Sequence, residues 1–191
     1  MYYAEFNVHA PFAAKKEAID YYARKAEKMG PGKQRNPIYA AMVQGMDQAL
    51  GRILDILDQL GIAENTLLIF VSDNGAVSWV NMKKNNTLPF EGYEKWLDTA
   101  PTSSEPLKGH KHTYYEGGVR VPMVMRWPGK IKPGSKSTEL VHVIDFYPTL
   151  LEVAGIKARP GQVLDGVSLI KVLQGGKAPD RPLFMHFPRA G

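Results

Sequence analysis

The 191-residue sequence predicts an α/β fold in which helices flank a layered, mostly parallel sheet. Two observations carry this prediction. Residues 38–60 have apolar side chains at helical spacing, so they are expected to form a long amphipathic helix. A continuous apolar run follows at residues 66–72, and such a run is typical of a strand buried on both faces of a parallel sheet.

Further helices and strands are expected on both sides of this pair. Asn36 is the expected N-cap of the long helix, with Pro37 in its first turn, and Gly61 is the expected C-cap. No internal repeat and no clear linker divides the chain. The other expected elements are strands at residues 2–6, 119–127, 140–143 and 183–187, and helices at residues 13–29, 145–154 (capped by Asp145) and 168–173.

Composition excludes several classes of function. The net charge is +5, but Lys and Arg are scattered and no nucleic-acid-binding motif accompanies them, so no nucleic-acid partner is expected. No apolar run approaches the length of a membrane span, so no membrane partner is expected either. The chain has no cysteine, which excludes disulfides, thiolate metal sites and cysteine catalysis within it.

Asp73 and Asn74 come directly after the apolar strand and before Gly75. In open α/β sheets, ligands bind outside the carboxyl ends of strands. A carboxylate beside an amide oxygen supplies hard oxygen ligands for calcium or magnesium. The alternative is a simple turn, because Asp-Asn-Gly is also favourable turn chemistry.

A glycine-bearing loop before the strand at 119–127 gathers cationic side chains. Lys111 lies between His110 and His112, and such groups can hold a sulfate or phosphate. The two histidines also form a weak metal motif, and solvated loop charges are the third alternative. His9 precedes Ala-Pro near the N-terminus, where a histidine can act as a general acid or contact an anion.

Taken together and in order, these motifs resemble the sulfatases, which belong to the alkaline phosphatase superfamily. They are His-x-Pro at 9–11, Ser-Asp-Asn-Gly at 72–75, Gly-x-Lys at 109–111 and Tyr-Glu-Gly-Gly-x-Arg-Val-Pro at 115–122. Stretches at 46–54, 142–151 and 164–169 are similar to that family as well. The resemblance covers nearly the whole chain and implies an alkaline-phosphatase-like fold.

The resemblance also implies roles for particular residues. Asp73 and Asn74 match the pair that ligates the active-site calcium, Lys111 matches the lysine that contacts sulfate, and His9 matches the histidine near the leaving-group oxygen. The substrate partner it implies is a sulfate ester. Many relatives have glycines around the lysine, so we interpret the flanking His110 and His112 as substrate contacts or as residues that narrow the site.

Two departures from the family pattern matter. The family's nucleophile is a formylglycine made from Cys or Ser in a Cys/Ser-x-Pro/Ala-x-Arg motif, and this chain has no complete motif of that kind. Residues 104–108 echo it, with Lys where Arg belongs and in the wrong place, so we interpret them as loop. Relatives also continue into a small C-terminal antiparallel subdomain.

Residues 1–191 are therefore expected to be an incomplete catalytic domain, without the nucleophile region and the C-terminal subdomain, and inactive alone. Its calcium site would be partial, and formylglycine is expected only in a longer parent chain. Self-association through an exposed sheet edge, or pairing with a missing N-terminal segment, is expected. The alternatives are a phosphonate monoester or phosphodiester hydrolase of the same superfamily, and a non-catalytic binding or assembly module. The compartment is not readable; export to the periplasm would suit a full-length bacterial relative.

Overall fold

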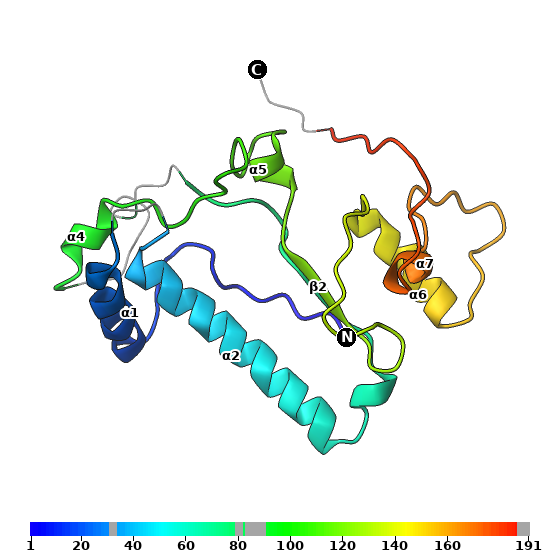
Figure 1. Cartoon of the computed structure of the whole chain (residues 1–191), viewed down its shortest axis with the longest axis horizontal. Helices are drawn as coiled ribbons and strands as arrows, with labels where there is room; N and C mark the ends of the chain where they lie inside the picture. Colours follow the sequence, from blue (N-terminus) through cyan, green and yellow to red (C-terminus); the bar gives the residue numbers. More distant parts are fainter. Residues whose placement is uncertain (31–33, 79–81, 83–90, 187–191) are drawn as a thin grey trace. The chain divides into compact units, whose positions relative to one another are not determined.

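The computed structural model describes residues 1–30, 34–78, 82 and 91–186 (Figure 1). The chain divides into two compact units. The first comprises residues 1–61 and 70–124, and the second comprises residues 62–69 and 125–191. All the residues singled out by the sequence for chemistry fall within the first unit.

Two helices dominate the first unit, α1 at Lys16–Lys28 and α2 at Pro37–Gln59. Both confirm the helices expected from apolar spacing. The side-chain oxygen of Asn36 accepts hydrogen bonds from the backbone amides of Ile38 and Tyr39, at 3.1 Å each, so Asn36 is the N-cap. Gly61 has a φ of +66°, the left-handed conformation that ends many helices.

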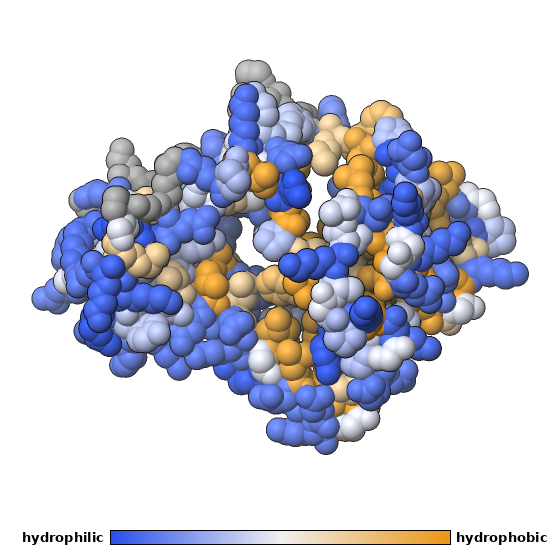
Figure 2. Space-filling view, viewed as in Figure 1, coloured by the Kyte–Doolittle hydropathy of each residue, from blue (hydrophilic) through white to orange (hydrophobic). Residues whose placement is uncertain are grey.

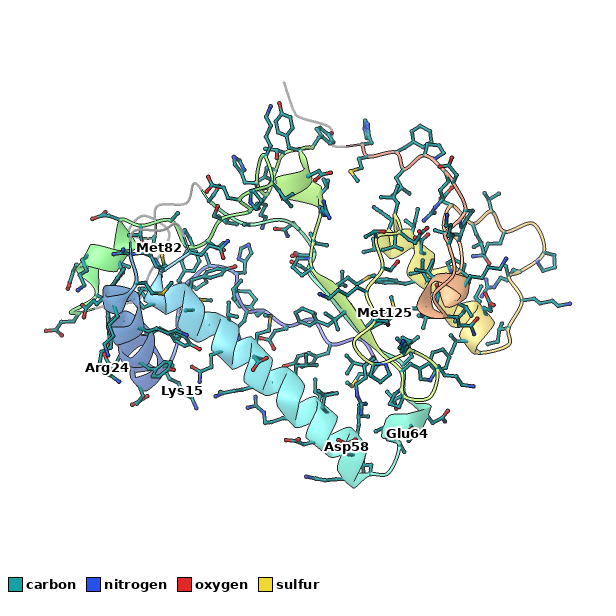
Figure 3. The ribbon with its side chains drawn as sticks, in the orientation of Figure 1. Lys15, Arg24, Asp58, Glu64, Met82 and Met125 are labelled. Atoms are coloured by element: carbon teal, nitrogen blue, oxygen red, sulfur yellow. The ribbon has the colours of Figure 1, made fainter. Side chains whose placement is uncertain are left out.

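The core of the first unit lies where α1, α2 and the short helix α4 (Glu94–Leu97) pack together. The Asn36 amide nitrogen donates to the backbone oxygen of Trp96 and to the Thr99 hydroxyl, at 2.9 Å each, so the cap of α2 also holds the α4 segment. Met82 lies beside the N-terminal end of α2 in Figure 3. The buried apolar residues of this core are Phe12, Ile19, Ala26, Ile38, Ala41, Met42, Met82, Tyr93 and Trp96.

Strands β1 (Leu68–Val71) and β2 (Met123–Arg126) pair in the described part of the chain as a two-stranded sheet. Beyond their ends, the Ser72 amide donates to the Pro122 oxygen at 3.1 Å and the Gly75 amide to the Gly118 oxygen at 3.0 Å. From the first of these pairs to the second, the residue number rises from 72 to 75 in one segment and falls from 122 to 118 in the other. The two segments therefore run antiparallel. The α/β class is confirmed, but this pair departs from the expected parallel arrangement, and β1 is half-buried rather than buried.

Among the residues that the structure describes, three expected strands are not formed. Residues 2–6 and 183–186 are irregular, residue 187 lies outside the described residues, and residues 140–142 lead into a 3₁₀ turn at Val143–Asp145. A strand is stable only where a neighbouring strand takes up its backbone hydrogen bonds. Near the N-terminus the Glu5 carboxylate instead accepts a hydrogen bond from the Asn7 amide, at 3.1 Å.

The second unit contains a 3₁₀ turn at Ala63–Asn65, helix α6 (Phe146–Val153) and helix α7 (Ile170–Leu173). Asp145 does not cap α6 through its side chain, contrary to expectation. Its carboxylate is fully buried and accepts hydrogen bonds from the amides of His142 and Val167, at 2.8 and 2.9 Å, and from the Arg181 guanidinium. These bonds reach across 36 residues of chain, so Asp145 organises the unit rather than one helix end.

Apolar side chains also reach the surface, as Figure 2 shows on one face. On α2 the exposed ones are Val43 and Ile56, and Leu60 follows the helix. Such residues are compatible with the expected self-association, which stays a prediction. None of the described helices is both long enough and apolar enough to span a membrane.

Candidate functional site

The Asp73–Asn74 pair lies on a turn directly after β1. The Ser72 hydroxyl donates to the backbone oxygen of Asn74 at 3.0 Å, which closes the turn from within. The Asp73 side chain is exposed and Asn74 is half-buried. The turn is therefore shaped by Ser72 and by backbone contacts, and the two predicted metal-binding side chains are not needed to hold it.

Gly75 brings this turn against the loop before β2. A Cβ atom at Gly75 would lie 1.9 Å from the backbone oxygen of Gly117, closer than any real contact. The Gly75 amide donates to the Gly118 oxygen at 3.0 Å. Gly75 is thus required because two backbones approach each other here, a reason more specific than the freedom to turn.

Lys111 is tied to the same turn through its main chain. Its amide donates to the backbone oxygen of Ala76 at 3.0 Å, two residues beyond Asn74. The loop around it is closed by Thr113, whose hydroxyl donates to the His110 oxygen at 2.7 Å and accepts from the His110 amide at 3.1 Å. The structure therefore brings the segment carrying Lys111 beside the segment carrying Asp73 and Asn74.

His110 and His112 differ in their surroundings. A ring nitrogen of His110 lies 2.6 Å from the backbone oxygen of Lys111, so His110 helps to close its own loop. His112 is exposed and has a φ of +70°, which is strained for a residue with a Cβ atom. A glycine would adopt this conformation freely, so the backbone at His112 is one that a glycine would fit without strain.

Lys108, the other lysine of the loop, is occupied by an aromatic ring. Its ammonium nitrogen lies 4.1 Å from the centroid of the Tyr115 ring, within the range of a cation–π contact. No cation–π contact of Lys111 is found among the described residues. The two lysines of this loop therefore differ in that an aromatic ring holds only the ammonium group of Lys108.

Ser104 was missed as a site residue by sequence reasoning. Its hydroxyl donates to the Gly117 oxygen at 2.7 Å and accepts from the Ala76 amide at 3.2 Å. Residues 104–108 are a loop, as interpreted, but this loop connects the Asp73–Asn74 turn to the loop that carries Lys111. Nothing in the run Thr-Ser-Ser distinguishes Ser104, because its partner Ala76 is 28 residues away.

His9 lies on a separate turn near the N-terminus. Its amide donates to the Phe6 oxygen at 3.0 Å, a ring nitrogen lies 2.8 Å from the Ala10 oxygen, and its ring stands 5.9 Å from that of Phe6. His9 is exposed. These recorded contacts all lie within residues 6–10, so they do not connect His9 with Asp73 or Lys111, and its expected role is untested.

The donor set has the right chemistry for calcium but too few members for a complete site. Asp73 and Asn74 offer a carboxylate and an amide oxygen, whereas calcium takes about six to eight oxygen ligands. No group of three or more His, Cys, Asp or Glu side chains suited to a metal is found within residues 1–30, 34–78, 82 and 91–186. Any calcium bound at this turn needs further ligands from water, substrate or another segment.

A carboxylate and an amide side chain on one loop thus adjoin a second loop that carries a lysine, at the end of a strand of an α/β fold. Comparison with known proteins identifies the class. The family model described as Sulfatase matches residues 1–156. A sulfatase from Formosa agariphila is 38% identical over 98% of this chain, and the mouse N-acetylgalactosamine-6-sulfatase is 32% identical over 97%.

Solved structures give the same result. The crystal structure of Ps i-CgsB in complex with k-i-k-neocarrahexaose is 27% identical to this chain and covers 90% of it, with a TM-score of 0.67. The chain belongs to the sulfatase family. It spans about a third of the length of the relatives it matches, 33% of the Formosa protein and 30% of the mouse protein.

Proposed function

We propose that this chain carries the calcium-binding and sulfate-binding part of a sulfuric ester hydrolase. The observation that carries the proposal is the hydrogen bond from the Lys111 amide to the Ala76 oxygen. This bond links the loop of the anion-binding lysine to the turn of the metal pair. The sulfatases among its relatives support the reaction class.

In this proposal each side chain has one task. Asp73 and Asn74 hold calcium, which when bound supplies positive charge beside the sulfate oxygens. The Lys111 ammonium lies against another sulfate oxygen, where negative charge concentrates in the transition state. His9 contacts the sulfate or protonates the leaving oxygen. His110 and His112 contact the rest of the substrate.

The nucleophile is proposed to lie in a longer parent chain. The 191 residues contain no cysteine. Ser104 is the serine of the stretch at 104–108 that partly resembles the nucleophile motif, and its hydroxyl donates its proton to the Gly117 oxygen. A chain with the binding groups but no activated nucleophile should bind a sulfate ester and leave it intact.

Sulfated carbohydrates are the substrate class that the relatives favour. One group is named for N-acetylgalactosamine 6-sulfate, and one solved relative holds a neocarrahexaose. A steryl-sulfatase is 33% identical over 83% of the chain, so a sugar is not the only class of substrate among relatives. The exposed His112 beside Lys111 is the residue whose contacts should depend most on the substrate's alcohol part.

The binding half of the proposal is tested with calcium and inorganic sulfate on the 191-residue chain. Calcium affinity, measured by calorimetry, should lie near the weak end of the protein range, a Kd of about 10⁻⁴ to 10⁻³ M. Asp73→Ala and Asn74→Ala should each weaken it at least about fivefold, since each removes one of the few ligands. The matched control is Asp55→Ala, an exposed carboxylate on α2. Equal weakening by Asp55→Ala would show general charge attraction and contradict the site.

Sulfate binding in saturating calcium tests the lysine. Lys111→Ala should weaken binding, whereas Lys25→Ala, an exposed lysine on α1, should not. The chain should bind inorganic sulfate more tightly than inorganic phosphate. Tighter binding of phosphate would favour the alternative of a phosphonate monoester or phosphodiester hydrolase. Release of 4-methylumbelliferone from its sulfate ester by this chain alone would contradict the assignment of the nucleophile to a longer parent.

A further inference from the structure

We infer that Ser104 is a positioning residue that holds the Asp73–Asn74 turn against the Lys111 loop. The contacts of Ser104 are those of the structure. That they matter for ligand binding rests on the proposed function. No role for this residue follows from the sequence motifs. Its hydroxyl reaches two segments that are far apart in the chain and that carry the two halves of the candidate site.

The hydroxyl donates one hydrogen bond to a main-chain group and accepts one from another. Its proton goes to the Gly117 oxygen at 2.7 Å, and its oxygen accepts the Ala76 amide at 3.2 Å. Gly117 is buried and Ala76 is half-buried. Removal of the hydroxyl would leave both groups without this partner, which is costly for polar groups away from water.

Ala76 is the junction through which Ser104 acts on Lys111. The Ala76 amide donates to Ser104, and the Ala76 oxygen accepts the Lys111 amide at 3.0 Å. On the other side, the Gly117 amide donates to the Lys108 oxygen at 2.7 Å, and Gly75 packs directly on the Gly117 oxygen. Ser104 therefore closes a ring of hydrogen bonds that includes the turn, the lysine loop and Gly117.

The neighbouring serine provides a matched comparison. The Ser103 hydroxyl accepts the Glu105 amide at 3.1 Å, and this contact stays within its own loop. Its backbone oxygen accepts from the Gln34 side chain at 2.7 Å, a bond that a change of side chain leaves in place. Ser103 and Ser104 have the same side chain and adjacent positions, but only Ser104 connects the two site segments.

The test is amide hydrogen exchange, residue by residue, in the metal-free 191-residue chain. Ser104→Ala should accelerate exchange at the Ala76 amide, which loses its acceptor, and also at the Lys111 amide, by about tenfold or more. The Lys111 amide is not bonded to Ser104, so its response reports positioning rather than one lost bond. Ser103→Ala should change neither amide, and Ser104→Thr, which keeps the hydroxyl, should restore both.

The outcomes separate this inference from the proposed function. Faster exchange at Ala76 with unchanged exchange at Lys111 would overturn it. If Ser104→Ala does not fold, Ser104→Cys replaces it. Because a thiol forms weaker hydrogen bonds, exchange at the Lys111 amide should accelerate to an intermediate degree. Unchanged exchange at the Lys111 amide in Ser104→Cys would overturn the inference. If the wild-type chain binds no calcium and the exchange result stands, the proposed function fails while the positioning role holds. If the wild-type chain binds calcium, Ser104→Ala should lower its calcium affinity and Ser103→Ala should leave that affinity unchanged.

Discussion

The candidate site in the first unit and the Asp145 cluster in the second are held together in opposite ways. In the site, main-chain groups and the hydroxyls of Ser72, Ser104 and Thr113 make the contacts, and Asp73 is exposed. In the second unit the Asp145 carboxylate makes the contacts itself, to two amides and a guanidinium, and is fully buried.

The difference separates charged residues with structural tasks from those available for chemistry. A carboxylate whose oxygens are all committed to internal donors has little capacity left for a ligand. A carboxylate on a turn that the backbone already holds can bind a cation without loss of the fold. Each aspartate follows a strand expected from the sequence, and the contacts in the structure show that the Asp145 carboxylate is already committed.

Asp145→Ala should cause the largest loss of stability. It removes the partner of Arg181, whose side chain is only 13% exposed, and two backbone donors lose their acceptor. Removal of one member of a buried ion pair costs about 3–5 kcal/mol. Urea denaturation should show this loss, with faster amide exchange at Val167. The exposed Asp180 supplies the control, because Asp180→Ala should leave the midpoint nearly unchanged. An equally small effect of Asp145→Ala would show that the Asp145 carboxylate does not hold the second unit together.

Gly75→Ala should destabilise the first unit by about 2–3 kcal/mol, because the new methyl group meets the fixed backbone oxygen of Gly117. Gly51→Ala is the control. Gly51 lies within α2 with nothing within 4 Å of the added Cβ, so this change should raise stability by about 0.5–1 kcal/mol. Denaturation midpoints for the two alanine variants should therefore move in opposite directions. Movement in the same direction would show that the close approach at Gly75 does not hold the site.

His112→Gly should have a smaller effect on stability and a separate effect on binding. It relieves a left-handed conformation that costs a non-glycine residue about 1–2 kcal/mol, and the added chain entropy of glycine offsets up to about 1 kcal/mol. Thermal unfolding should therefore show an unchanged or slightly raised midpoint. If the His112 side chain contacts substrate as proposed, sulfated-sugar affinity should fall in the same variant. Unchanged affinity for a panel of sulfate esters would remove His112 from the site.

Sequence patterns predicted the parts of the fold whose causes are local. Helix α2 has its period, its Asn36 cap and its terminal Gly61 within one stretch of chain, so each observation supports the others. Asp73, Asn74 and Lys111 were proposed because they lie in compact motifs after a strand and within a loop, and their roles stay predictions. The hydrogen bond from the Lys111 amide to the Ala76 oxygen shows that these two motifs adjoin each other.

The parts that failed depend on distant partners. Residues 2–6 have strand-like composition, but a strand requires a neighbour that the residues themselves do not specify. Asp145 stands at the start of a helix, yet its partner Arg181 is 36 residues away. Ser104 likewise depends on Ala76 and Gly117, which its neighbours in the sequence do not indicate. His9 remains a prediction from its motif alone.

Asp20 on α1 should give the smallest effect, through pH. Its pKa is held below the ordinary value of 3.8 by hydrogen bonds from Lys16 and from the Tyr93 hydroxyl. A carboxylate with a lowered pKa in the folded state stabilises the fold above its unfolded pKa, and this contribution disappears as pH falls through the folded value. The difference in Tm between the wild type and Asp20→Asn should therefore be present at neutral pH and shrink below about pH 4. Glu17→Gln, an exposed change on the same helix, serves as the control. A difference that persists unchanged at pH 2 would show that Asp20 supports the contact between α1 and Tyr93 without its charge.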